Sequence, residues 1–256
     1  MLIITADDLG KDVLSTNNCM DCHRKKRITT ASILVFMDDT ERAAELAVQE
    51  GLETGLHLNL VLPYSSPDVS DDLRCIQHSA VRFYRLGPWT QAVYNPLITK
   101  AVASVFKSQL DEYRRIFKKE PIYFNGHKHL HLSLNMILGR VLPFGSIVRK
   151  SFTFQAGEKN LLNRRFRSIV DAWLKSRYVI SDSFYSLSLV RDPARLAKIV
   201  NLALNSHVEL MVHPWSPADY DSLLGKDFGN LLLRAPLGNF EALGSLRRSQ
   251  SRPGLV

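Results

Sequence analysis

Short apolar runs rich in β-branched residues alternate with longer segments of helical periodicity along much of this chain. Residues 2–6, 30–36 and 54–60 have the composition of strands, and the segments 13–26 and 40–50 between them have that of helices. This alternation is typical of βα units and a parallel sheet. The sequence therefore predicts an α/β fold with mostly parallel strands, and its 256 residues suit a single barrel domain.

The later part of the chain continues the pattern with one interruption. We expect helices and strands in turn: helices at 97–119, 134–142, 161–175 and 193–205, and strands at 121–125, 146–150 and 208–212. Four prolines interrupt residues 61–96, which indicates a long active-site loop or a small insertion. Gly, Ser, Arg and Pro dominate after residue 242, so we expect a barrel over residues 1–242 and a basic mobile tail over 243–256.

The charge balance is moderately basic, with 33 Lys and Arg against 25 Asp and Glu and a net charge of +8. Such a surplus can attract nucleic acid, an anionic membrane or a phosphorylated substrate. Most of the positive residues lie in short clusters typical of solvated helix faces, and no nucleic-acid-binding motif is present. We expect no nucleic-acid partner, whereas the basic helix at 161–175 leaves peripheral contact with an anionic membrane or lipid-linked substrate open.

The cysteines and the apolar runs indicate the cellular compartment. Three cysteines are an odd number, no secretory leader precedes the first strand, and no apolar stretch approaches 18 residues. Cys19 and Cys22 have the spacing of half a zinc site, but two helix residues are the simpler interpretation. The sequence thus predicts a cytoplasmic protein, in contact at most with the inner face of the membrane, and leaves its oligomeric state open.

Polar side chains gather at the carboxyl ends of four predicted strands, namely Asp7-Asp8, His57, His127-x-His129-x-His131 and His213. In a parallel α/β barrel these ends share one face, where active sites are built. Each motif alone has a structural alternative, such as an Asx turn for the two aspartates or a capping role for His213. Their joint occurrence favours one active site.

The local patterns suggest how these side chains are presented. A turn beginning at Asp7 would direct both carboxylates into one pocket, although neighbours in a strand point to opposite sides. Alternation in residues 55–60 places His57 and Asn59 on one face of their strand. Three histidines at alternate positions project to one side wherever the backbone stays extended, and a surface cluster without a ligand is the less favoured alternative.

One carboxylate and two imidazoles can hold a divalent cation and leave positions open for water and substrate. Such a cation lowers the pKa of bound water from roughly 16 to about 7 in the case of zinc, so that a nearby carboxylate can complete its deprotonation. His213, fixed by Pro214, is suited to protonate a leaving amine because imidazole titrates near neutrality.

Five sequence blocks together resemble the YdjC family of carbohydrate deacetylases, which includes chitooligosaccharide and hopanoid-associated deacetylases. The blocks cover roughly the first 215 residues and read Ala6-Asp7-Asp8-Leu9-Gly10, Thr29-Thr30-Ala31-Ser32, Gly55-Leu56-His57-Leu58-Asn59-Leu60, Gly126-His127-Lys128-His129-Leu130-His131 and Glu209-Leu210-Met211-Val212-His213-Pro214. The resemblance implies a distorted TIM-like (β/α) barrel. It also implies hydrolysis of the N-acetyl group of an amino sugar such as N-acetylglucosamine, with release of acetate.

The resemblance assigns roles by position. Asp8, His57 and His127 match the metal ligands, with Mg²⁺ or Zn²⁺ as the ion, and Asp7 matches the general base. His213 matches the general acid. Further residues expected near the substrate are Asn59, His129, His131, Arg149 and Trp215.

The chain departs from the family pattern at Leu9 and Asn125, where an aromatic residue and an aspartate are usual, and at Trp215, where glycine is common. Residues 62–95 match poorly, so the resemblance does not specify the glycan. Two other functions stay open at this stage: a metal-dependent phosphoesterase, which would suit the basic surface, and a non-catalytic carbohydrate-binding barrel.

Overall fold

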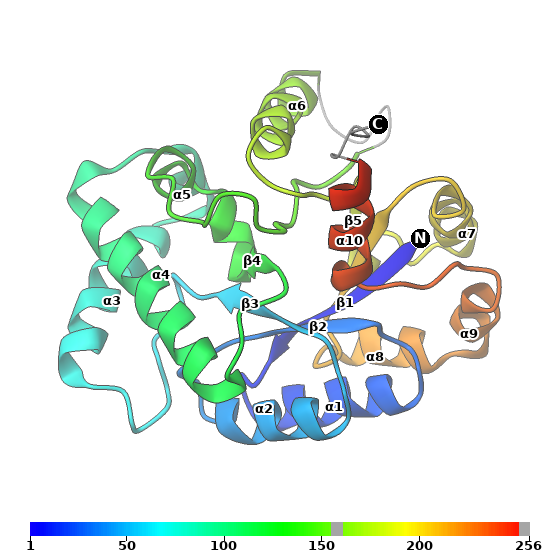
Figure 1. Cartoon of the computed structure of the whole chain (residues 1–256), viewed down its shortest axis with the longest axis horizontal. Coiled ribbons are helices and arrows are strands. Elements are labelled where there is room, and N and C mark those ends of the chain that lie inside the picture. The colour runs from blue at the N-terminus through cyan, green and yellow to red at the C-terminus, as the bar shows by residue number, and fades with distance from the viewer. Residues whose placement is uncertain (155–160, 251–256) are drawn as a thin grey trace, which may run out of the picture. The chain divides into compact units, whose positions relative to one another are not determined.

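The computed structural model describes residues 1–154 and 161–250, and its elements are labelled in Figure 1. Contacts between backbone positions divide the chain into two compact units. The terminal unit comprises residues 1–6, 21–30 and 144–256, and the central unit comprises residues 7–20 and 31–143.

The central unit contains three parallel strands, β2 (Thr30–Ile33), β3 (Thr54–Leu58) and β4 (Phe124–Gly126). All residues of these strands are buried, as expected for strands covered on both faces. The helical elements of this part of the chain are α1 (Val13–Arg24), α2 (Thr40–Gln49), α3 (Asp71–Tyr84), η1 (Pro88–Ala92), α4 (Pro96–Phe117), η2 (His127–Leu132) and α5 (Leu134–Leu138).

The terminal unit contains β5 (Ser183–Ser186), β6 (Val208–Val212) and most of β1 (Leu2–Leu9), again in parallel pairs. Among the residues that the structure describes, the hydrogen-bonded strand order is β4-β3-β2-β1-β6-β5. The helical elements here are α6 (Leu161–Lys175), η3 (Leu187–Leu189), α7 (Pro193–Leu202), α8 (Pro217–Leu224), α9 (Lys226–Leu232) and α10 (Phe240–Gln250). These pairings confirm the α/β class and the parallel strands that the sequence predicts.

Helix boundaries follow local sequence chemistry. Asn95 and Asp192 cap α4 and α7 with side-chain oxygens, and a proline follows each of them at the first helical position. A proline costs least there because that N–H has no partner within the helix. Lys118 ends α4 in the left-handed conformation, with φ of 53°.

Three predicted boundaries are corrected by the structure. Residues 61–96 are not one long loop, because they contain α3 and η1, and Ser70 caps α3 by accepting from the Leu73 N–H. The alternative interpretation of this segment, a small insertion, stays a prediction. Residues 146–150 form only an isolated bridge, between Ile147 and Val179. Helix α10 continues to residue 250, so the predicted tail cannot begin at 243, and residues 251–256 lie outside the described part of the chain.

Within the described residues, every helix is too short or too polar to cross a lipid bilayer.

Candidate functional site

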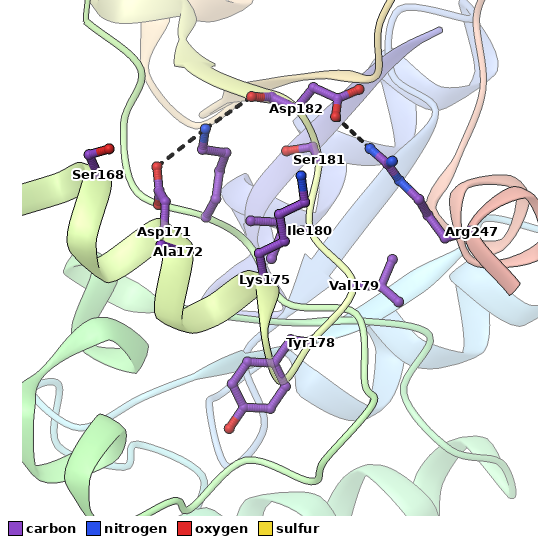
Figure 2. A pocket seen from close by; sticks show the side chains of 11 residues that line it. Ser168, Asp171, Ala172, Lys175, Tyr178, Val179, Ile180, Ser181, Asp182 and Arg247 are labelled. Atoms are coloured by element: carbon purple, nitrogen blue, oxygen red, sulfur yellow. Dashed lines mark hydrogen bonds and ion pairs between the residues drawn. The ribbon is translucent and has the colours of Figure 1, made fainter. Parts of the chain in front are cut away.

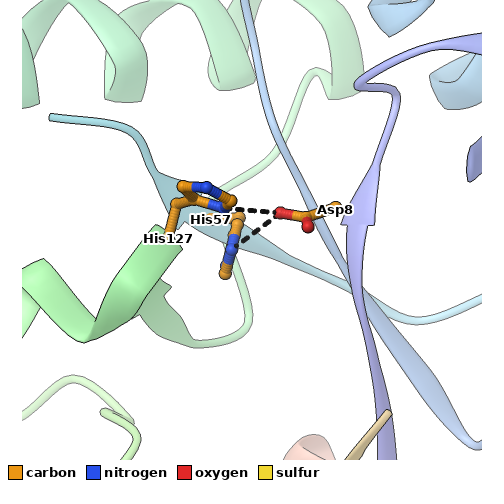
Figure 3. Close-up of side chains that lie close together, drawn as sticks. All are labelled: Asp8, His57 and His127. Carbon is orange, nitrogen blue, oxygen red and sulfur yellow. Dashed lines mark hydrogen bonds and ion pairs between the residues drawn. The ribbon is translucent and has the colours of Figure 1, made fainter. Parts of the chain in front are cut away.

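Asp8, His57 and His127 converge in the central unit (Figure 3). Asp8 Oδ1 lies 3.2 Å from His57 Nε2 and 2.8 Å from His127 Nδ1. One potential ligand atom from each residue lies within 4.8 Å of the other two, which is close enough for all three to bind one ion. The structure thus brings together the three residues that the sequence predicts as metal ligands.

The ends of three strands position these side chains. His57 is in β3, His127 directly follows β4, and Asp8 is close to the end of β1. Asp8 has a φ of 69°, which breaks the strand alternation at this position. Aspartate tolerates this left-handed conformation better than most residues. The predicted turn beginning at Asp7 is wrong, because β1 continues through both aspartates to Leu9. The positive φ of Asp8 within the strand accompanies an arrangement in which both carboxylates raise the pKa of the His57 ring.

Asp7 is bound by two side chains, one from β2 and one from β4. The Ser32 hydroxyl donates to Asp7 Oδ1 at 2.7 Å, and Asn125 Nδ2 donates to the same oxygen at 3.3 Å. All three side chains are buried. Ser32 and Asn125 thus position the carboxylate that we expect to act as the base.

Asn125 also fixes the proton arrangement on His57. Because its amide nitrogen donates to Asp7, its oxygen Oδ1 faces His57 Nδ1 at 2.7 Å and accepts from it. His57 therefore carries a proton on Nδ1 and directs Nε2 toward Asp8. Metal-binding histidines in proteins are oriented by a hydrogen-bond partner on the ring nitrogen that does not bind the metal.

The electrostatics of the cluster favour a positive charge at its centre. Burial opposes ionisation of Asp8, yet hydrogen bonds with His127 and His57 hold its pKa well below the usual value. Burial likewise opposes a charged His57 ring, but Asp7 and Asp8 outweigh it and raise the His57 pKa. The two negative carboxylates thus draw a proton to His57, and a divalent cation can take that proton's place.

The donor set fits a divalent metal ion. It consists of one carboxylate and two imidazoles, with the His57 tautomer already selected for binding through Nε2. Asp8 and His57 are fully buried, whereas the His127 side chain is 15% exposed, so solvent reaches the cluster on the His127 side.

The other two histidines of the His127 motif do not join this cluster. The backbone leaves the extended conformation after His127 and forms η2, in which Lys128 and His129 have φ of 52° and 58°. The alternation that would place three histidines on one side therefore does not apply. His131 is buried against Gly126, and a Cβ added at Gly126 would lie 2.9 Å from the His131 backbone nitrogen.

Asn59 is bonded to the loop that follows it through its side chain and to Gln109 of α4 through its backbone. Its side-chain oxygen accepts from the N–H groups of Val61 and Leu62, and its amide nitrogen donates to the Leu62 carbonyl. These bonds hold the chain where β3 leads into the 61–70 segment. The prediction that Asn59 and His129 contact substrate stays a prediction.

The remaining predicted residues belong to the terminal unit. Arg149 is fully buried and binds Glu209 Oε1 through Nε and Nη2, each at 2.7 Å. His213 follows β6, its backbone N–H donates to Asp219, and its ring packs edge-on against Trp215 with centroids 5.6 Å apart. Roles in proton transfer and substrate contact stay predictions for these residues.

Sequence reasoning missed Ser32 and Asn125 as parts of the site. Ser32 lies in a block with no assigned role, although a polar residue inside a buried strand is a signal, because buried hydroxyls need partners. Asn125 directly precedes the Gly-His pair, and its only signal in the sequence is that it replaces the aspartate usual in the family. Its carbonyl oxygen still accepts from His57 as an aspartate oxygen would.

A family model described as "YdjC-like protein" matches residues 1–229. Among curated relatives, the carbohydrate deacetylase of Clostridium beijerinckii is 23% identical over 221 residues, which cover 83% of this chain and 80% of that protein. The mouse carbohydrate deacetylase is 25% identical over 132 residues, or 51% of this chain, and the match spans only 43% of the mouse protein. A chitooligosaccharide deacetylase of Proteus mirabilis is 25% identical over 135 residues, covering 52% of this chain and 50% of that protein.

Two solved structures share the fold. The Enterococcus faecalis protein EF3048, whose description refers to cellobiose-phosphate cleavage, superposes with a TM-score of 0.65 at 15% identity and covers 94% of this chain and 98% of its own. A family 4 acetyl xylan esterase from Clostridium thermocellum, solved with a cobalt ion, gives a TM-score of 0.51 at 12% identity, covering 96% and 91%. These likenesses confirm the expected α/β fold over nearly the whole chain.

Proposed function

The chain belongs to the YdjC-like protein family, and on that premise we propose that it is a metal-dependent hydrolase that removes the N-acetyl group from an acetylated amino sugar. The observation that carries the proposal is the convergence of Asp8, His57 and His127 on one point, with Asp7 held beside them. Relatives named carbohydrate deacetylase and chitooligosaccharide deacetylase supply the substrate class.

The three converging residues would hold the cation. Two of the three donors are imidazoles, which suit zinc better than magnesium, so we propose zinc as the preferred ion. The chemistry supplied by such a cation when bound is Lewis acidity, which polarises an acyl carbonyl and acidifies water. Asn125 keeps the His57 ring in the orientation that this binding needs.

Asp7 is proposed as the general base. The two donors on its Oδ1, Ser32 and Asn125, favour the ionised carboxylate and fix its orientation. In that state it can accept a proton from the attacking water as the new C–O bond forms at the acetamide carbon.

His213 is proposed as the general acid that protonates the departing amine when the C–N bond breaks. Ala6 and Val212 are register partners in the parallel pair of β1 and β6, and Asp7 and His213 directly follow them in the sequence. The reaction consumes one water and yields acetate and the free amino sugar. The substrate we propose is an N-acetylglucosamine-type glycan or glycolipid.

Acetate release from chitooligosaccharides tests the proposal directly. The full chain, freed of metal with a chelator and reloaded with zinc, magnesium or cobalt, should release acetate only after reloading. His57→Ala and Asp8→Asn should abolish both metal content, measured by elemental analysis, and activity. Asp7→Asn should retain the metal and lose activity, because its proposed role is in proton transfer.

His78→Ala and Asp68→Asn are matched controls, because both positions are exposed and lie outside the cluster. They should retain metal and activity. Bound zinc without acetate release from any acetylated glycan would favour a non-catalytic carbohydrate-binding role. Full activity in the chelated protein, or in Asp7→Asn, would contradict the mechanism.

A further inference from the structure

The terminal unit contains a polar cavity of about 590 Å³. It is lined by α6, by the segment 178–182 that leads into β5, and by Arg247 of α10 (Figure 2). The volume falls within the range of about 300–1,000 Å³ that is typical of small-molecule sites. Its polar lining includes the charged groups of Lys150, Asp171, Lys175, Asp182 and Arg247.

The two carboxylates of this cavity are already bound by protein donors. Asp171 Oδ1 accepts from the Ser151 N–H at 3.0 Å, and its Oδ2 lies 3.3 Å from Lys150 Nζ. Asp182 Oδ2 accepts from the His207 N–H at 2.9 Å, and its Oδ1 accepts from Arg247. A cationic ligand would have to displace these donors.

Two other hydrogen-bond donors line the same cavity, the Lys175 ammonium and the Ser181 hydroxyl. Lys175 is exposed and forms no ion pair with any residue that the structure describes. Ser181 is only 2% exposed, and its hydroxyl has no hydrogen-bond partner among the described residues although it lines the cavity. A buried hydroxyl without a partner costs stability, so it indicates a group that a ligand satisfies.

The residues that line the cavity have a net formal charge of +1, since three cationic side chains accompany two carboxylates. The surplus comes from Lys175, because the other four charges pair with one another. A ligand that fits must therefore be anionic and must accept hydrogen bonds from an ammonium group and a hydroxyl.

From these observations we infer that the cavity is a binding site for the phosphate group of a small molecule, separate from the metal cluster. A phosphate offers more acceptor oxygens than a carboxylate, so it can bind the ammonium of Lys175 and the Ser181 hydroxyl together with the hydroxyl of Ser168, an exposed residue that also lines the cavity. The cavity lies where β5 begins, because Ser181 and Asp182 immediately precede that strand. Asp8, by contrast, lies near the end of β1, and Asp8, His57 and His127 all belong to the central unit.

Calorimetric titration of the full chain at low ionic strength tests this site. The probes are inorganic phosphate, glucose 6-phosphate, glucose and acetate. We expect saturable binding of a phosphate-bearing probe and none of glucose. Tighter binding of glucose 6-phosphate than of inorganic phosphate would identify a phosphate ester as the ligand, and the reverse order would identify free phosphate.

Variants locate the binding. Lys175→Gln and Ser181→Ala should each weaken phosphate binding about tenfold, as expected for loss of a charge-assisted hydrogen bond. Lys198→Gln is the matched control, because Lys198 is an exposed helical lysine of the same unit outside the cavity. Ser181→Ala should not lower the Tm, since the hydroxyl has no protein partner to lose. Absence of binding by either phosphate, equal binding of acetate, or unchanged binding in both cavity variants would overturn the inference.

Discussion

Arg149→Met tests the buried ion pair of the terminal unit. Both Arg149 and Glu209 are fully buried, and two guanidinium nitrogens lie 2.7 Å from Glu209 Oε1. The guanidinium carbon also lies 4.8 Å from the centroid of the Phe184 ring. Methionine would fill much of the volume against Phe184 but would leave the Glu209 carboxylate without its cation.

The expected cost follows from the unpaired charge. Removing one partner of a buried pair costs about 3–5 kcal/mol, because the other charge stays in a medium that solvates it poorly. For a chain of this size, each kcal/mol corresponds to about 2–4 °C, so the Tm should fall by about 6–20 °C. Urea unfolding followed by circular dichroism and by fluorescence measures the free energy directly.

A second substitution separates charge from packing. Glu209→Gln in the Arg149→Met background removes the stranded charge and keeps an oxygen that can accept from the Thr5 hydroxyl, which donates to Glu209 at 3.0 Å in the native chain. This double variant should regain most of the lost stability. A loss below about 1 kcal/mol in Arg149→Met, or a double variant no more stable than the single one, would refute the reasoning.

Three further changes give separate tests. Gly55→Ala places a Cβ 2.6 Å from the Tyr123 carbonyl oxygen, which is a backbone atom of the neighbouring segment. The free energy of unfolding should therefore fall by about 1–3 kcal/mol, and an unchanged Tm would contradict this. Burial opposes ionisation of Asp39, but its hydrogen bonds with Arg42 prevail and lower its pKa. The stabilisation is therefore present above the unfolded pKa of about 3.9 and is lost as the pH falls through the folded pKa. The stability advantage of wild type over Asp39→Asn in urea titrations should therefore shrink below about pH 4, and a constant difference would exclude this linkage. Asn125→Ala removes the nearer of two oxygens beside His57 Nδ1, the other being Ser32 Oγ at 3.2 Å, and should weaken zinc binding about 10- to 100-fold in a chelator competition, whereas equal affinity would show that Asn125 does not orient the ring.

The sequence predicted the order and type of most elements because burial imposes a period on the chain. Residues 2–6 and 54–60 carry apolar runs that only a covered strand explains, and both segments contain strands. It failed at residues 61–96, where prolines and polar residues hide the pattern of α3. Helix α3 is instead defined by a Ser70 cap and by four buried residues, which become visible only once the helix packs.

The candidate site was predictable in its ligands and not in its supporting contacts. Asp8, His57 and His127 lie near the carboxyl ends of predicted parallel strands, so residue type and position indicated a cluster there, and the resemblance to the YdjC family singled out these three as ligands. Ser32 and Asn125 act through hydrogen bonds to a carboxylate 25 and 118 residues away in the sequence. Which residues meet across such a separation in the sequence depends on the register of the strands, and no local pattern encodes that register.

The sequence by itself determined which residue types stand at strand ends, and with them an α/β fold and a cluster able to bind a cation. Tertiary structure decided that His129 and His131 stay outside that cluster, because the left-handed turn at Lys128 and His129 directs the chain away after His127. It also decided that Arg149 pairs with Glu209 inside the terminal unit. The amino-acid sequence specifies the chemistry of each side chain. Where a side chain points and what it contacts depend on backbone torsions and strand register, which are fixed only when the strands pack.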